Sequence, residues 1–196
     1  MKPDNAYQLL KKSINALSDI PDELIDSLFA ICRLTRVDKG KLFVRAGEVP
    51  DIVGFNLDGL FRLFYIDDDG NDLTKGFSTP GKFVVSYSAM VQNRPSYFFI
   101  EALSHTHILE FKYSRWIRMA EQNIRWYPLL FKLVEAVYIM KELREKSFLI
   151  DDATTRYLAF QKEYPGLESK IKLYHIASFI GITPGALSRI RKNLKN

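Results

Sequence analysis

The last 24 residues, from Leu173 to Asn196, constrain the fold more than any other part of the chain. Ala177 stands four residues before Gly181, and Leu187 follows that glycine by six residues. A small side chain lets two helices approach closely, and glycine supplies the positive φ that a sharp turn requires. Thr183 is a suitable N-cap, and Pro184 fits the first helical position. The spacing therefore predicts a helix-turn-helix.

This segment also divides into an inner and an outer face. The apolar residues are expected to form one seam between the two helices: Ile176, Ile180, Ile182, Leu187, Ile190 and Leu194. The second helix then leaves polar side chains for an external partner: Ser188, Arg189, Arg191, Lys192 and Lys195.

Charge indicates what kind of partner this is. Residues 170–196 hold six basic side chains and no acidic one, whereas residues 1–169 hold 22 basic and 23 acidic side chains. A near-neutral body with a basic end favours a polyanionic partner, because each lysine or arginine that neutralises a phosphate releases a condensed counterion. Together with the helix-turn-helix spacing, this predicts double-stranded DNA.

The rest of the composition is typical of a cytoplasmic protein. The N-terminus lacks the continuous apolar stretch of a secretory signal, and no apolar run reaches the length of a membrane span. The single cysteine, Cys32, excludes an internal disulfide or a cysteine-ligated cluster and is expected in the core. We therefore expect a cytoplasmic location and no membrane partner.

The middle of the chain has the texture of an antiparallel β-structure. Helices are expected at about 4–17 and 21–34. Between residues 39 and 111, about seven short β-rich runs alternate with glycine-containing turns, without a helix of useful length. This spacing predicts an antiparallel barrel or jelly roll, and hence an α+β fold.

Helices return after the barrel. Ser114 is expected to cap a short helix, and Pro128 to begin a long one that ends near residue 148. Its apolar residues at three- and four-residue spacing, Leu130, Leu133, Val137 and Met140, fit either a two-helix dimer seam or a helix lying on its own barrel. The predicted domains are a barrel with N-terminal helices (1–127), a dimerisation helix (128–150) and a helix-turn-helix domain (151–196).

The order of barrel, long helix and helix-turn-helix resembles the Crp–Fnr superfamily of bacterial transcription regulators. The runs that carry the resemblance are KGKLFVRAGEVPD, NLDGLFRLFYIDDDGND, PGKFVVSYSAM, ATTRYLAFQKEYPGL and IASFIGITPGALSRIRKNL. The resemblance implies a cyclic-nucleotide-binding-like barrel, a homodimer that binds a palindromic operator, a small effector and RNA polymerase as a further candidate partner. It implies no catalytic activity and no resident cofactor.

The barrel departs from the members of the superfamily that bind cyclic AMP. Those members hold the ribose and the cyclic phosphate with a Gly-Glu pair and an Arg-Ser/Thr pair, where this chain has Val85-Ser86 and Ser96-Tyr97. An arginine pairs with phosphate through a fork of donors, and here only Arg94 lies close in sequence. We therefore expect an effector other than cyclic AMP, or none, with these candidate pocket residues: Ser86, Tyr87, Arg94, Ser96 and Tyr97.

The recognition segment departs as well. The resemblance carries DNA contacts to Thr183, Gly185, Ser188, Arg189 and Lys192. Many members have glutamate where this chain has Gly185, which cannot read a base through a side chain. The operator of the classical members is therefore not expected, nor is a full β-wing after Leu194.

A metal-dependent, cupin-like enzyme is the alternative function. His105, His107 and Glu110 suggest a barrel metal site, but a gap of only two residues separates the second histidine from the glutamate, where cupins have three or four. On a strand, Glu110 would point away from the face that the two histidines share. We therefore expect no metal site and no enzyme.

Overall fold

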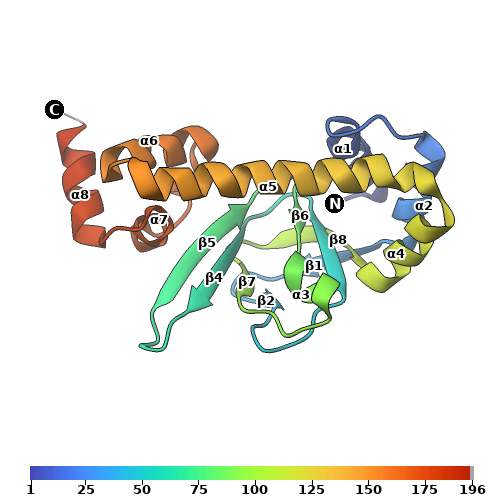
Figure 1. The fold of residues 1–196 in the computed structure, drawn as a ribbon, viewed down its shortest axis with the longest axis horizontal. Helices are drawn as coiled ribbons and strands as arrows, with labels where there is room; N and C mark the ends of the chain where they lie inside the picture. Colours follow the sequence, from blue (N-terminus) through green and yellow to red (C-terminus); the bar gives the residue numbers. More distant parts are fainter. Residues whose placement is uncertain (195–196) are drawn as a thin grey trace. The chain divides into compact units, whose positions relative to one another are not determined.

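The computed structural model describes residues 1–194 (Figure 1), so that Lys195 lies outside the described residues. Contacts divide the chain into two compact units. The first, called the barrel unit below, comprises Met1–Leu63 and Phe77–Ala136. The second, called the C-terminal unit, comprises Phe64–Gly76 and the chain from Val137 onward. The predicted three-part division of the chain stays a prediction.

Within residues 1–194, eight strands form two four-stranded sheets, which confirms the predicted antiparallel β-structure. The sheet orders are β1-β8-β3-β6 and β2-β7-β4-β5, and the pairs β1–β8, β3–β8, β3–β6 and β2–β7 are antiparallel. The strands are β1 (Arg33–Val37), β2 (Leu42–Val44), β3 (Ile52–Asn56), β4 (Phe61–Ile66), β5 (Asp72–Ser78), β6 (Phe83–Val84), β7 (Phe99–Ala102) and β8 (Thr106–Lys112).

Side chains alternate between two cores along β3 and β8, as the two-residue period of a strand requires. Val53 and Phe55 join one core, which lies under the helices, whereas Ile108 belongs to a second core. Gly54 faces Ile108, and a Cβ atom at this glycine would lie 2.2 Å from Ile108 Cδ1. The Ile108 side chain can occupy this place because the glycine has none.

Four helices cover the first of these cores: α1 (Pro3–Asn15), α2 (Asp22–Ile31), α4 (Tyr113–Gln122) and the start of α5 (Tyr127–Ile150). Leu10 and Ile25 are fully buried there, and Trp116 and Trp126 meet edge to face with ring centroids 6.3 Å apart. Cys32 packs partly buried at the edge of this core, and burial raises the pKa of its thiol to about 12. The thiol is therefore protonated at neutral pH and unreactive.

Three sequence expectations about the barrel were wrong. The second helix ends at Ile31, and a strand that was not expected, β1, follows without an intervening turn residue. A short helix, α3 (Tyr87–Gln92), interrupts the β-rich region. Ser114 is not the cap of α4, whose N-cap is Lys112; the Ser114 backbone and hydroxyl donate instead to Asp51, at 2.9 Å each.

The C-terminal unit contains the predicted helices, namely the end of α5, then α6 (Ala153–Glu163), α7 (Leu173–Ile180) and α8 (Pro184–Asn193). The described residues also contain two short 3-10 helices, η1 (Ile124–Trp126) in the barrel unit and η2 (Leu167–Ser169) between α6 and α7. Asp152 caps α6 by accepting a hydrogen bond from the Thr155 backbone at 2.7 Å. Within the described residues, no helix is long and apolar enough to span a membrane.

Helix α5 exposes apolar side chains along much of its length. Leu130 and Leu133, half of the predicted seam, pack against the barrel unit's own core. The other half, Val137 and Met140, is exposed to solvent. A second exposed row follows four-, three- and four-residue spacing: Tyr127, Phe131, Val134 and Tyr138, which are 46–66% exposed. One apolar stripe of α5 thus packs on the barrel of the same chain, and another is exposed to solvent. The first fits a helix lying on its own barrel, and the second fits a two-helix dimer seam.

Candidate nucleic-acid interface

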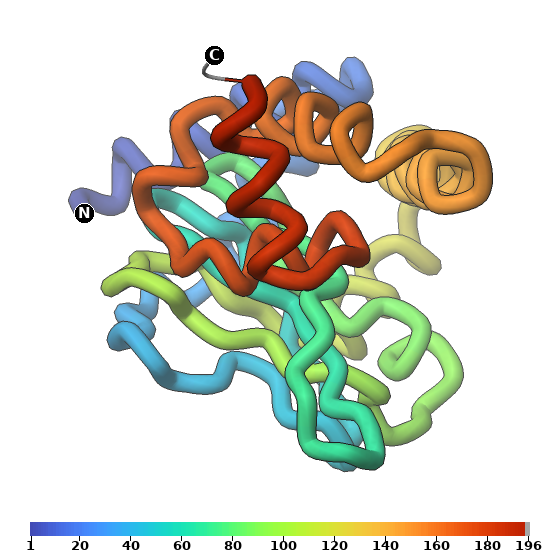
Figure 2. Tube along the Cα trace, turned by 90° about the vertical axis from the view of Figure 1, so that its left-hand side faces the viewer, coloured from blue at the N-terminus to red at the C-terminus, as the bar shows by residue number. Residues whose placement is uncertain are grey.

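The turn between α7 and α8 has the geometry that its sequence predicts (Figure 2). Gly181 ends α7 with φ at +71°, and the Ile182 backbone donates to the Ala177 carbonyl at 2.9 Å. Thr183 then caps α8, because its hydroxyl accepts a hydrogen bond from the Ala186 backbone at 3.2 Å. Pro184 occupies the first turn of α8, where its missing N–H costs nothing.

The inner face of this helix pair is well packed. Ile176, Ala177 and Leu187 are fully buried, and Ile180 is 2% exposed. The predicted seam is wrong at its end, because Leu194 is 47% exposed. A seam that buries these side chains fixes the rotation of α8 about its axis, and therefore determines which residues face outward.

The outward face of α8 carries the predicted DNA-contacting residues. Gly185, Ser188, Arg189 and Lys192 are all exposed, and they recur at three, four and seven residues, which is one face of a helix. The Ser188 hydroxyl donates to the Pro184 carbonyl at 3.0 Å and keeps its lone pairs available. Thr183 is exposed at the start of the same helix. The structure thus brings the five residues together on one surface.

Arg191 does not share this surface. Its Nε lies 2.5 Å from Glu168 Oε1 in η2, and the exposed fractions of the two side chains are 29% and 22%. The sequence grouped Arg191 with the outward basic residues, and this assignment was wrong. A pairing across more than twenty residues of sequence leaves no local signal.

Two arginines that the sequence analysis did not identify bind the C-terminal end of α7. Arg144 on α5 donates to the Phe179 carbonyl at 2.9 Å, and Arg156 on α6 donates to the Ile180 carbonyl at 2.8 Å. These are carbonyls of the last turn of α7, where backbone acceptors lack helical partners and cations are favourable. The Phe148 ring lies beneath both guanidinium groups, 4.9 and 5.5 Å away. Burial lowers the pKa of Arg144, which stays cationic.

The tip of the β4–β5 hairpin belongs to the same compact unit. Ser178 on α7 accepts a hydrogen bond from the Thr74 backbone at 2.7 Å and donates to the Asp72 carbonyl at 3.3 Å. Nearby, burial lowers the pKa of Lys75, and the positive charges of Lys141 and Arg144 lower it further. The hairpin therefore contacts the first helix of the pair directly.

The candidate effector residues are only partly brought together. Ser86 and Ser96 are buried, with their hydroxyl oxygens 2.9 Å apart. Ser96 donates to the Phe98 carbonyl at 2.8 Å, so that the Ser86 hydroxyl is the donor within the pair. Tyr97 is 72% exposed and lies outside this buried pair.

The other two candidates also lie at the surface. Tyr87 is 44% exposed, and its ring meets Tyr113 edge to face. Arg94 is exposed on the loop before the strand. A cation that sequence reasoning missed, Arg62 on β4, is only 1% exposed and is already engaged by its neighbours.

The histidines of the barrel have separate partners. His105 Nδ1 lies 3.0 Å from Asp38, and His107 Nδ1 lies 2.6 Å from Asp58. The hydrogen bond to His105 contributes most to lowering the pKa of Asp38. In residues 1–194, no cluster of three or more histidine, cysteine, aspartate or glutamate side chains could hold a metal ion. Glu110 pairs with Arg33 at 3.2 Å rather than joining the histidines.

The chain is similar to known proteins in one domain and in its overall architecture. Residues 34–123 match the model of the cyclic nucleotide-binding domain. The structure is similar to that of FixK2 from Bradyrhizobium japonicum, with a TM-score of 0.73, 17% identity, and 84% of this chain and 85% of that chain covered. No curated protein is significantly similar to the chain in sequence.

Two further regulators have the same architecture. The c-di-GMP responsive global regulator CLP of Xanthomonas campestris aligns with a TM-score of 0.67, 15% identity, and 89% and 92% of the two chains covered. The Thermus thermophilus catabolite activator protein aligns with a TM-score of 0.56, 17% identity, and 93% and 86% covered. The chain therefore has the fold of these regulators, and its residues 34–123 match the cyclic nucleotide-binding domain.

Proposed function

We propose that this protein is a sequence-specific DNA-binding transcription regulator in which α8 is the recognition helix. The observation that supports this most is the outward face of α8, where Arg189 and Lys192 stand exposed beside Ser188 while Leu187 is buried behind them. An α-helix fits the major groove of DNA, and an arginine fork can bind O6 and N7 of guanine. Gly185 leaves space on this face without reading a base.

We propose further that the protein acts as a two-fold dimer through α5. The row of Tyr127, Phe131, Val134 and Tyr138 has the heptad spacing of a two-helix seam and is uncovered in a single chain. Symmetric dimers of helix-turn-helix proteins present two recognition helices about 34 Å apart, which suits palindromic operators. RNA polymerase is a candidate partner of such a regulator.

The barrel is proposed to respond to an effector other than cyclic AMP, or to bind none. The Ser86 and Ser96 hydroxyls, where a cyclic phosphate would be held in nucleotide-binding members, satisfy one another and the Phe98 backbone. Arg94 is exposed, and Arg62 is buried and engaged. An anion placed there would lose its hydration without gaining a dedicated cation, which costs several kcal/mol.

Equilibrium binding to duplex DNA tests the proposed function. Arg189→Ala should cost about 1–3 kcal/mol on the preferred sequence and relax the preference at one base pair per half-site. Lys192→Ala should weaken all sequences alike and reduce the salt dependence by about one unit. If neither substitution changes DNA affinity, α8 is not the recognition helix.

A further inference from the structure

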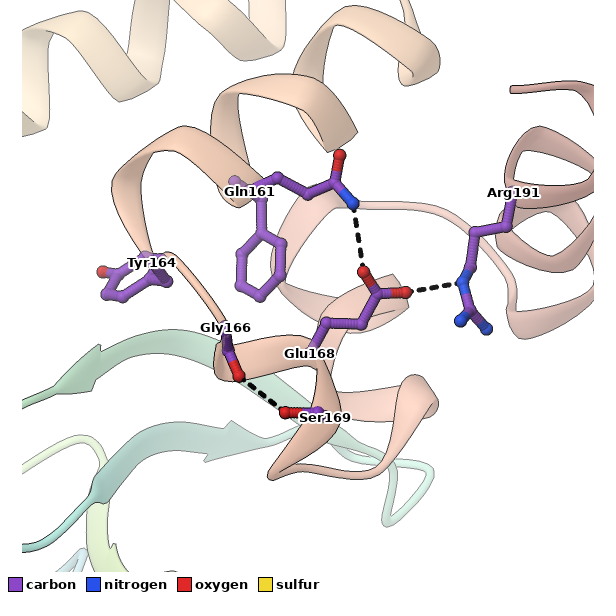
Figure 3. Close-up of a pocket in the computed structure, with 7 residues that line it drawn as sticks. Gln161, Tyr164, Gly166, Glu168, Ser169 and Arg191 are labelled. Carbon is purple, nitrogen blue, oxygen red and sulfur yellow. Dashed lines mark hydrogen bonds and ion pairs between the residues drawn. The ribbon is translucent and has the colours of Figure 1, made fainter. Parts of the chain in front are cut away.

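A network of four polar side chains joins α8 to the α6–η2 segment. Figure 3 shows three of them, Gln161, Glu168 and Arg191. Glu168 is at its centre. Its carboxylate accepts hydrogen bonds from the Tyr157 hydroxyl at 2.8 and 2.9 Å and from Gln161 Nε2 at 3.0 Å, and it pairs with Arg191. Gln161 also donates to the Tyr157 hydroxyl at 3.0 Å, so that the donors hold each other in place.

This network borders a surface pocket. A pocket of about 340 Å³ is lined by Phe160, Gln161, Tyr164, Gly166, Glu168, Ser169 and Arg191. Tyr157 and Phe160 are 3% and 1% exposed, so two aromatic side chains of α6 are buried beside the network. Burial and the hydrogen bond to Glu168 raise the pKa of Tyr157, which remains a hydrogen-bond donor at neutral pH.

Arg191 occupies a different flank of α8 from the exposed basic residues. It follows the buried Leu187 by four residues, which places the two side chains on one side of the helix. Arg189, two residues before it, lies on the opposite side of the helix, and Lys192, one residue after it, is turned away by about 100°; both are exposed. The Glu168–Arg191 pair is therefore a tether between the inner flank of α8 and the rest of the domain.

We propose that Glu168 is a positioning residue for the recognition helix, which holds Arg191 against η2 and thereby sets the orientation in which α8 presents Arg189 and Lys192. This inference rests on the proposed DNA-binding function. It assigns Arg191 no contact with DNA phosphate, although composition counts it among the basic residues of the segment. When one partner of a partly buried ion pair is removed, the other charge is left without its counter-charge. Both Glu168 and Arg191 are therefore needed to hold α8 against η2.

Three variants of the full-length protein test this role: Glu168→Gln, Arg191→Gln and the matched control Lys192→Gln. The first measurement is amide hydrogen exchange in α8 without DNA. Glu168→Gln and Arg191→Gln should each accelerate exchange in the last turn of α8, whereas Lys192→Gln should leave it unchanged. Equal exchange in all three variants and the wild type would overturn the proposal.

The second measurement is the dependence of DNA affinity on salt concentration. Arg191→Gln should weaken binding, because α8 is no longer held in its orientation, with an unchanged slope. Lys192→Gln should lower the slope by about 0.9, the value for one phosphate contact. A similar drop in slope for Arg191→Gln would show that Arg191 contacts phosphate and would overturn the proposal. If the wild type binds no duplex, the proposed function fails, and the exchange measurement alone decides the positioning role.

Discussion

Replacing Gly181 by alanine should destabilise the C-terminal unit by about 2–3 kcal/mol. The residue has φ at +71°, a conformation that costs an L-residue roughly 1–2 kcal/mol. The new Cβ would also lie 2.7 Å from Phe148 Cε1, well inside the carbon–carbon optimum of about 3.5–4.0 Å. Overpacking costs about 1–3 kcal/mol, and the lower end applies because the Phe148 ring is 43% exposed and can move.

Gly185→Ala is the matched control. No heavy atom lies within 4 Å of its added Cβ, and alanine is a better helix former than glycine by roughly 0.5–1 kcal/mol. This variant should therefore gain stability while Gly181→Ala loses it. Amide exchange of α7 and α8 is the appropriate assay, because both tryptophans, Trp116 and Trp126, belong to the barrel unit. Equal effects of the two substitutions would refute the conformational reasoning.

The contact with Phe148 can be separated from the backbone strain. Combining Gly181→Ala with Phe148→Leu removes the ring and should recover about 1 kcal/mol relative to the sum of the single changes. The remaining cost is then the positive φ. If the double variant shows no coupling, the ring does not constrain the turn, and the whole loss has to be attributed to the backbone.

Three further predictions concern other parts of the molecule. The Thr155 backbone hydrogen bond lowers the pKa of Asp152. This stabilisation is complete above the unfolded pKa near 3.9 and is lost as pH falls through the folded pKa, so Asp152→Ala should destabilise at pH 7 and converge with the wild type in acid unfolding. Val134→Glu should yield a monomer in light scattering, whereas Lys146→Glu, at an exposed charged position of the same helix, should leave the dimer intact. Calorimetry should detect no micromolar binding of cyclic AMP or cyclic GMP; saturable binding of either would contradict the account of the barrel.

The features that the sequence predicted best are those with local causes. Gly181, Thr183 and Pro184 each encode their own backbone conformation, so the helix-turn-helix and the position of its turn followed from a few residues. The regular spacing of short β-rich runs and glycine-containing turns likewise predicted the antiparallel β-structure. The exposed face of α8 followed from burial of Leu187 on the opposite side.

What the sequence did not reveal depends on partners that are distant along the chain. Ser114 looked like a helix cap, but Asp51 binds it across 63 residues. Arg191 has the sequence context of an outward-facing cation, but it pairs with Glu168, which lies 23 residues earlier in the chain. Strand β1 was missed because no turn residue separates it from α2, so periodicity ran on through the junction. The stripe on α5 was ambiguous because Leu130 and Leu133 pack on the barrel while neighbouring positions remain exposed.

Selection from a pool of random-sequence duplexes tests the central claim most directly. The wild-type protein should enrich a two-fold symmetric sequence whose half-sites lie about one helical turn apart, roughly 10 base pairs from centre to centre. Arg189→Ala should enrich the same spacing with one position per half-site relaxed. Failure of the wild type to enrich any sequence, in a protein shown to be folded, would contradict the assignment of this chain as a sequence-specific DNA-binding regulator.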